Sequence, residues 1–180
     1  MLKVACMVFF AFWASSGLAE TYKKTYSKGN WALYRVDGTQ IRAPNGKYEA
    51  IDGLCLAAFQ SSKAKLQFWM APAAIAAQKP HLRDYIWVQI SAETWNFRNR
   101  NAPSGLSVGI SSYTERRAKY EGSTIGFGVP NFQEPFGIFL MFAGTQQSID
   151  VTDRKGTVIA KFPANGFAEV RDKLFSCAGV

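Results

Sequence analysis

Two short stretches in the middle of the chain combine aromatic rings with cationic side chains, which together suit the binding of an anionic partner. Aromatic rings stack on sugar faces or fill apolar pockets, and arginine forks bind carboxylates or phosphates. The stretches WNFRNRN and YTERRAKY therefore predict two binding loops for an acidic protein or an anionic envelope glycan. Their candidate contact residues are Trp95, Phe97, Arg98 and Arg100 in the first and Tyr113, Arg116, Arg117, Lys119 and Tyr120 in the second. The alternative is a pair of solvated hairpin tips whose rings pack back into the core.

Catalytic residue types are sparse. His81 is the single histidine, so a site with several histidine ligands is impossible, and we expect no metal and no cofactor. Asp84 could orient His81, and Ser91 or Ser104 could be brought close by folding, but no G-x-S-x-G nucleophile motif is present. We therefore expect His81 to be an ordinary loop or helix-end residue and predict no catalytic residue.

Paired carboxylates leave one enzymatic alternative open. Glycoside hydrolysis needs two carboxyl groups that flank the scissile bond, one of them with a raised pKa. Most candidates lie in polar or turn-rich segments, although folding could bring any two together. These candidates are Glu93, Glu115, Glu121, Glu134 and Asp150. A cell-wall glycan hydrolase is therefore the competing class.

The first 19 residues have the three parts of a secretory signal peptide. Lys3 supplies the positive charge, residues 4–14 form an apolar run, and Gly17 and Ala19 are the small residues before a cleavage site at Glu20. The run is too short to span a bilayer, so we expect cleavage rather than a retained anchor. The mature chain is then residues 20–180, a single domain in the periplasm or outside the cell, without a stable membrane anchor.

Two cysteines remain once Cys6 has left with the signal. In an oxidising compartment Cys55 and Cys177 can form only one intrachain disulfide. Such a bond would close a loop of more than a hundred residues. The alternative is two buried thiols that do not meet, and no C-x-x-C motif suggests redox chemistry.

The last segment of the chain predicts an amphipathic helix that carries the second cysteine. Phe167, Val170, Leu174 and Cys177 recur at three- and four-residue steps and so share one face. Asn165 or Gly166 can begin this helix and Gly179 can end it. We expect it to pack on a sheet and to be joined there through Cys177.

Between the two termini, short apolar segments alternate with turn residues, which favours antiparallel sheet. Asp37-Gly38 predicts a hairpin turn, and Asn45-Gly46 predicts another turn shortly after it. LCLAAF predicts a strand that contains Cys55, and APAAIAAQKP predicts a brief helix between Pro72 and Pro80. Further strands are expected in KLQFWM, DYIWVQI, LSVGISS, STIGFGV and GIFLMFA, with a last hairpin from QSIDV to TVIAKF. The fold class is mainly β: an antiparallel sandwich or partly closed barrel with a C-terminal α-helix.

The chain is basic, with 21 Lys and Arg residues against 13 Asp and Glu residues. Cleavage removes Lys3 and leaves 20 basic against 13 acidic residues, a formal charge of +7. A charge of this sign attracts acidic proteins and anionic envelope surfaces. Nucleic acid is disfavoured as a partner by the export signal, and a solubilising surface is the other interpretation of the charge.

This layout resembles that of small exported proteobacterial proteins of the invasion-associated locus B type. The resemblance rests on the signal peptide, the early tryptophan in GNWALYRVDG, the cysteine strand LCLAAF and the closing segment from Lys161 to Cys177. It implies a β-rich envelope or secreted protein without known catalytic chemistry, in a family linked to host-cell interaction. The chain departs from the pattern because it has no cysteine between Cys55 and Cys177, so only the layout is carried over.

The sequence as a whole predicts an exported, non-enzymatic interaction protein. Its partner would be an acidic protein or an anionic envelope component, and the sharper version of the hypothesis is an inhibitor or immunity protein that blocks an acidic enzyme.

Overall fold

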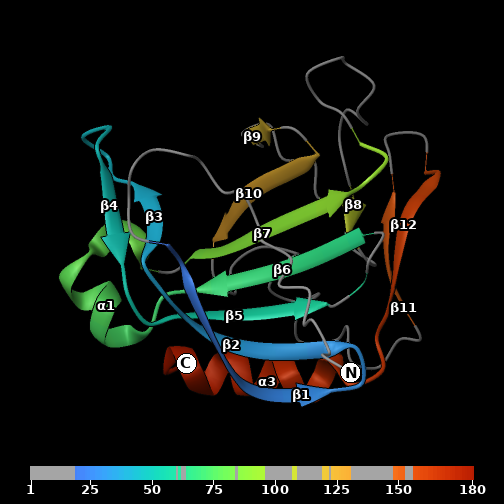
Figure 1. The fold of residues 1–180 in the computed structure, drawn as a ribbon, viewed down its shortest axis with the longest axis horizontal. Helices are drawn as coiled ribbons and strands as arrows, with labels where there is room; N and C mark the ends of the chain where they lie inside the picture. The colour runs from blue at the N-terminus through green and yellow to red at the C-terminus, as the bar shows by residue number, and fades with distance from the viewer. Residues whose placement is uncertain are drawn as a thin grey trace, which may run out of the picture.

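The computed structural model describes residues 19–59, 61, 64–83, 85–95, 107–108, 119–121, 123–130, 148–152 and 156–180 (Figure 1). The predicted signal peptide lies outside these residues except for Ala19. The strand expected in GIFLMFA lies outside them as well. Within the described part of the chain, no helix has both the length and the apolar character needed to cross a bilayer.

A seven-stranded antiparallel sheet forms the main layer. Its order is β1 (Thr21–Lys28), β2 (Trp31–Asp37), β5 (Leu54–Phe59), β6 (Ala64–Met70), β7 (Tyr85–Ala92), β10 (Thr124–Pro130) and β9 (Lys119–Glu121). The first five of these strands follow one another in chain order, as expected for short antiparallel connections. A hairpin of β3 (Thr39–Arg42) and β4 (Tyr48–Ile51) is inserted between β2 and β5.

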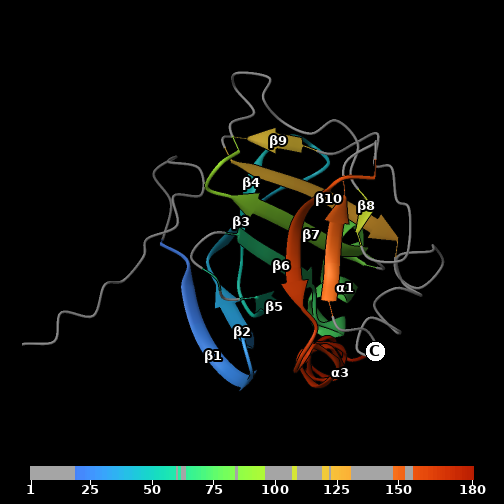
Figure 2. The ribbon, with the colours of Figure 1, turned by 90° about the vertical axis from the view of Figure 1, so that its right-hand side faces the viewer.

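A smaller sheet and the last helix cover one face of this layer. The smaller sheet has the order β12 (Val158–Pro163), β11 (Ser148–Thr152) and β8 (Ser107–Val108), and the helix is α3 (Phe167–Ala178). Figure 1 shows β11 and β12 running across the direction of the large-sheet strands at the right-hand side, and Figure 2 shows α3 below these two strands. The predicted mainly β fold with a C-terminal helix is therefore confirmed. Among the described strands, β1 and β9 are free edges of the large sheet, so the arrangement is sandwich-like and not a closed barrel.

The principal core lies between the large sheet and this cover. Trp31 is fully buried at its centre, with its ring centroid 4.5 Å from that of Phe167 and 5.3 Å from that of Phe59. The Trp31 indole Nε1 also donates a hydrogen bond of 2.8 Å to the carbonyl of Pro163, just before α3. Burying a large apolar side chain contributes roughly 1.5–3 kcal/mol. Packing at Trp31 therefore joins β2, near the start of the described chain, to the segment that leads into α3.

Strand β5 is buried along its whole length because both of its faces are covered. Cys55 and its alternate neighbours face the principal core, whereas Leu54 and Leu56 face a second apolar cluster. Ile51 of β4 and Leu82 of the 3₁₀ helix η1 (Pro80–Leu82) close this second cluster. A continuous apolar run is the pattern expected of a strand covered on both sides.

Helix α3 begins and ends at glycines in the left-handed region, as the sequence predicts. Gly166 (φ 83°) precedes the helix and Gly179 (φ 79°) ends it. Phe167, Val170 and Leu174 are buried against the sheet. The helix packs on β1, β2 and β5.

The predicted disulfide between Cys55 and Cys177 is confirmed. It joins β5 to the last turn of α3 with a Cα–Cα distance of 6.1 Å and spans 122 residues of sequence. Closing a loop of this size removes conformational freedom from the unfolded chain, which the chain-entropy model equates to about 5 kcal/mol.

The prediction of a hairpin at Asp37-Gly38 is wrong, although Asp-Gly is a strong two-residue turn pattern. Strand β3 pairs with β4, and β2 pairs with β1 and β5. Two reciprocal bonds explain the difference: the Gly53 N–H donates to Asp37 Oδ1 (2.6 Å) and the Gly38 N–H donates to Asp52 Oδ1 (2.7 Å). These bonds hold together the two ends of the β3–β4 excursion.

Other local predictions are confirmed. Asn45-Gly46 turns the chain between β3 and β4, with Gly46 at φ 81°. The short helix is α1 (Ala73–Gln78), and the last hairpin is β11–β12.

Candidate functional site at the basic edge of the sheet

Most of the predicted binding residues lie outside the described residues. The exceptions are Trp95, which follows β7, and Lys119 and Tyr120, whose backbone belongs to β9. Lys119 pairs with Gly126 and Tyr120 with Ile125, so this part of the second stretch is at the edge of the large sheet. The residues outside the description are Phe97, Arg98, Arg100, Tyr113, Arg116 and Arg117.

Trp95 is 8% exposed and belongs to the principal core. Its backbone N–H donates to the carbonyl of Ala92 (3.0 Å), which closes the turn after β7. The ring therefore packs inward, as the alternative interpretation of this stretch expects, and contact of Trp95 with a partner stays a prediction.

The described residues show a basic surface that the motifs of the sequence did not predict. Strand β1 forms the opposite edge of the large sheet from β9, and seven of its eight residues are exposed. We call its aromatic and cationic residues the basic edge. They are Tyr22, Lys23, Lys24, Tyr26 and Lys28. The stretch TYKKTYSK has tyrosines and lysines at two-residue steps, which is the period of a β-strand.

One face of the basic edge lies beside Tyr34 of β2. Lys24 is the cross-strand partner of Tyr34, and its Nζ lies 6.0 Å from the centroid of the Tyr34 ring. The Tyr22 ring packs edge-on against the same ring at 6.2 Å. Partial burial, the larger cause, and a hydrogen bond to Glu20, the smaller one, raise the pKa of Tyr22 above its usual value. This face therefore presents the ammonium group of Lys24 over the aromatic ring of Tyr34.

The other face of the basic edge is held by α3. The Tyr26 hydroxyl donates a 2.7 Å hydrogen bond to Glu169, and Lys28 Nζ lies 3.3 Å from the same carboxylate. These two contacts, with that of Tyr26 first, lower the pKa of Glu169. Lys173 lies 5.9 Å from the centroid of the Tyr26 ring. The helix thus fixes the C-terminal half of β1 and partly neutralises Lys28.

Two glycine backbones bring the end of β1 against the start of α3. A Cβ on Gly166 would lie 2.4 Å from the carbonyl oxygen of Lys28, and one on Gly29 would lie 3.0 Å from the carbonyl oxygen of Asn165. Both glycines also have positive φ. The turn between β1 and β2 is therefore seated on the turn before α3 by direct backbone contact.

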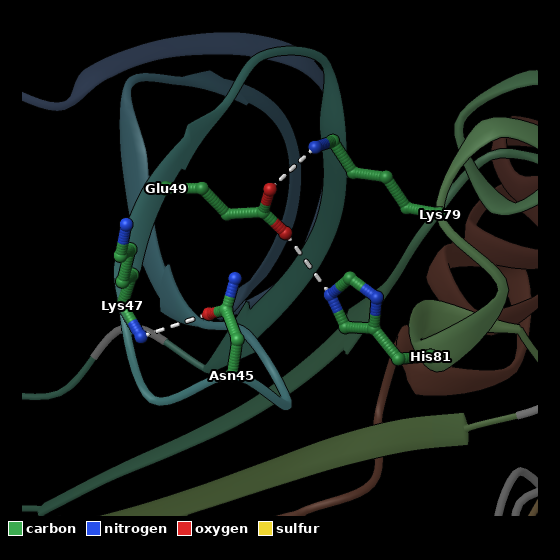
Figure 3. A network of polar contacts seen from close by, with 5 residues as sticks. All are labelled: Asn45, Lys47, Glu49, Lys79 and His81. Carbon is green, nitrogen blue, oxygen red and sulfur yellow. Dashed lines mark hydrogen bonds and ion pairs between the residues drawn. The ribbon is translucent and has the colours of Figure 1, made fainter.

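A separate polar cluster lies between the β3–β4 hairpin and the segment after α1, where Glu49 of β4 meets Lys79 and His81 (Figure 3). Lys79 Nζ lies 2.6 Å from Glu49 Oε2, and His81 Nε2 lies 3.0 Å from Glu49 Oε1. The hydrogen bond from Lys79, the largest influence, lowers the pKa of Glu49.

His81 Nε2 and Glu49 Oε1 are both shielded from solvent. The 3.0 Å contact places the imidazole beside the carboxylate without a well-aligned hydrogen bond between the two atoms. The cluster links the β3–β4 hairpin to the segment between α1 and η1. His81 is a helix-end residue, as expected, and its partner here is Glu49.

Groups suited to metal binding do not occur among the described residues: nowhere in that part of the chain do three His, Cys, Asp or Glu side chains gather as a metal site would require. Comparisons of the chain with protein-family models, curated proteins and solved structures found no match. The resemblance to the invasion-associated locus B type therefore stays a prediction.

Proposed function

We propose that the mature chain is an exported, non-enzymatic interaction protein that binds an acidic protein or an anionic component of the cell envelope. The observation that carries the proposal is the basic edge. Lys23 and Lys24 are exposed on a regular strand, and Lys24 lies over an aromatic ring. Arginine and lysine side chains next to aromatic rings suit partners that present carboxylates, sulfates or phosphates.

Two carboxyl groups of the described residues have a pKa shift opposite to the one that a glycosidase acid needs. A glycosidase acid needs a raised pKa. Cationic or hydroxyl partners lower the pKa of both Glu49 and Glu169. Asp37 and Asp52 accept backbone hydrogen bonds, so their described role is to hold the base of the β3–β4 excursion.

The two predicted loops extend the proposal to a second surface. Their arginines and aromatic residues have the same chemistry as the basic edge, and the finer role of an inhibitor or immunity protein would use them against an acidic enzyme. Charge reversal by Arg116→Glu and Arg117→Glu should weaken capture of the partner from an envelope extract. Unchanged capture would exclude this loop from the binding surface.

Binding to a defined anionic polymer tests the basic edge directly. The disulfide-bonded mature protein should bind immobilised poly-L-glutamate at low salt and should not bind neutral dextran. The double variant Lys23→Glu/Lys24→Glu should bind about tenfold more weakly, because each reversed exposed contact changes the binding free energy by roughly 0.5–1 kcal/mol. The matched control is Lys47→Glu/Arg83→Glu, which makes the same charge change at two exposed residues away from β1. Equal binding by the two variants would reject the basic edge as the site.

A further inference from the structure

Strand β1 offers a partner more than charge, because it is an edge of the large sheet. In the described part of the chain its one sheet neighbour is β2. An edge strand directs alternate N–H and C=O groups away from the sheet, and these groups can pair with an added strand. Figures 1 and 2 both show β1 at the outer border of the molecule. Its side chains are exposed, whereas Trp31, Ala32 and Leu33 of β2 beside it are buried.

The bulge in β1 divides the strand into two parts with different surroundings. The pairing register with β2 shifts between Lys24 and Tyr26, and Thr25 Oγ1 bonds back to the carbonyl of Leu33. Beyond the bulge, Tyr26 and Lys28 are engaged by α3. Before it, residues 21–24 pair with β2 in unbroken register and carry Lys23 and Lys24.

Charge decides what kind of strand can be added here. A second copy of β1 would double the number of lysines along the shared seam, and like charges on neighbouring strands are destabilising. An acidic strand would instead place carboxylates beside Lys23 and Lys24. The contacts of β1 with α3 hold the edge in its extended form before binding, which lowers the ordering cost of association.

We propose that residues 21–24 of β1 bind an extended acidic segment of a partner protein as an additional strand of the seven-stranded sheet. This inference rests on the proposed function, because it names the partner class and the binding mode of the basic edge. Backbone hydrogen bonds from the edge provide affinity, and the lysines select carboxylate side chains on the added strand.

The test uses a fluorescein-labelled octapeptide of alternating valine and glutamate, measured by fluorescence anisotropy with the disulfide-bonded mature protein. The control peptide has the same sequence with N-methyl groups on its two central residues. Adjacent N–H groups of a strand point to opposite edges, so one methyl group faces β1 whichever edge of the peptide pairs. At physiological salt, the unmodified peptide should bind at least tenfold more tightly.

The protein variants give the second arm. Lys23→Glu/Lys24→Glu should weaken binding of the unmodified peptide at least tenfold, and the control Lys47→Glu/Arg83→Glu should leave it unchanged. Hydrogen exchange at residues 21–24 should slow when the peptide binds, because outward N–H groups acquire acceptors. Exchange elsewhere in the large sheet should not change.

The outcomes separate this inference from the proposed function. Equal binding of the methylated and unmodified peptides would overturn strand addition while leaving attraction to anions intact. Failure of both peptides to bind would also overturn it, and the proposed function would still be decided by poly-L-glutamate. The wild-type protein could instead form a dimer that Lys23→Glu/Lys24→Glu abolishes. That result would show that a second copy of the chain pairs with β1, and it would overturn the acidic-segment proposal.

Discussion

Removing the disulfide should be the most destabilising change that leaves the core sequence intact. The Cys55–Cys177 bond spans 122 residues. For a loop of that length, the chain-entropy model gives a loss of about 16 cal/mol/K in the unfolded state, or about 5 kcal/mol at 25 °C. For a domain of this size, each kcal/mol corresponds to a shift in melting temperature of about 2–4 °C, so the melting temperature should fall by about 10–20 °C.

Two preparations separate the cross-link from the packing of the sulfur atoms. Wild-type protein in a dithiol reductant keeps both side chains and loses only the bond, whereas Cys55→Ala/Cys177→Ala also leaves space beside the fully buried Cys55. Urea unfolding followed by tryptophan fluorescence should show a large loss of stability for both and a somewhat larger loss for the alanine variant.

The native fold should survive the loss of the bond under mild conditions. Phe167, Val170 and Leu174 still hold α3 on the sheet, so far-ultraviolet circular dichroism at 20 °C should be unchanged. Before reduction, thiol labelling of unfolded protein that comprises residues 20–180 should give no product. A stability loss below about 1 kcal/mol in both preparations would refute the reasoning that the closed loop is a major contribution.

Two further changes test the contact between β1 and the start of α3 and the cluster around Glu49. Gly166→Ala should cost about 1–3 kcal/mol, because the new Cβ meets the Lys28 carbonyl and φ is positive, as measured by urea unfolding. Gly156→Ala has the same φ strain with open space around the Cβ, so an equal loss there would show that the contact with β1 is unimportant. Glu49→Gln should remove part of the acid sensitivity of folding. The folded-state pKa of Glu49 is lowered, chiefly by Lys79, so its stabilising contribution is present above its usual unfolded value of about 4.3 and disappears as the pH falls through the lower folded value. The wild-type protein should lose more stability than Glu49→Gln between pH 6 and pH 3, and identical pH profiles would contradict this role.

Local patterns in the sequence were sufficient for the elements whose structure is decided locally. The glycines at 166 and 179, the apolar spacing of α3 and the turn at Asn45-Gly46 each predict the observed conformation. The disulfide was predictable because only two cysteines, Cys55 and Cys177, lie outside the predicted signal peptide. The run LCLAAF predicted a strand, and its burial on both faces was found only in the structure.

Contacts between distant segments decided the rest. Asp37-Gly38 has the chemistry of a hairpin turn, but its bonds to Asp52 and Gly53 connect it to a segment after the excursion. The basic edge was not predictable from the sequence, because strand order, and not composition, makes β1 an edge. The meeting of Glu49 with His81 is likewise a product of tertiary folding, since β4 and η1 lie apart in the sequence.

The position of the disulfide affects how the protein would withstand proteolysis. The covalent ring that it closes contains every residue from Cys55 to Cys177, including both predicted binding stretches. A single cut within that ring would leave the two pieces attached through sulfur. A clipped molecule would therefore migrate as one species on a non-reducing gel, and the basic edge would remain tethered to the fragment that follows the cut.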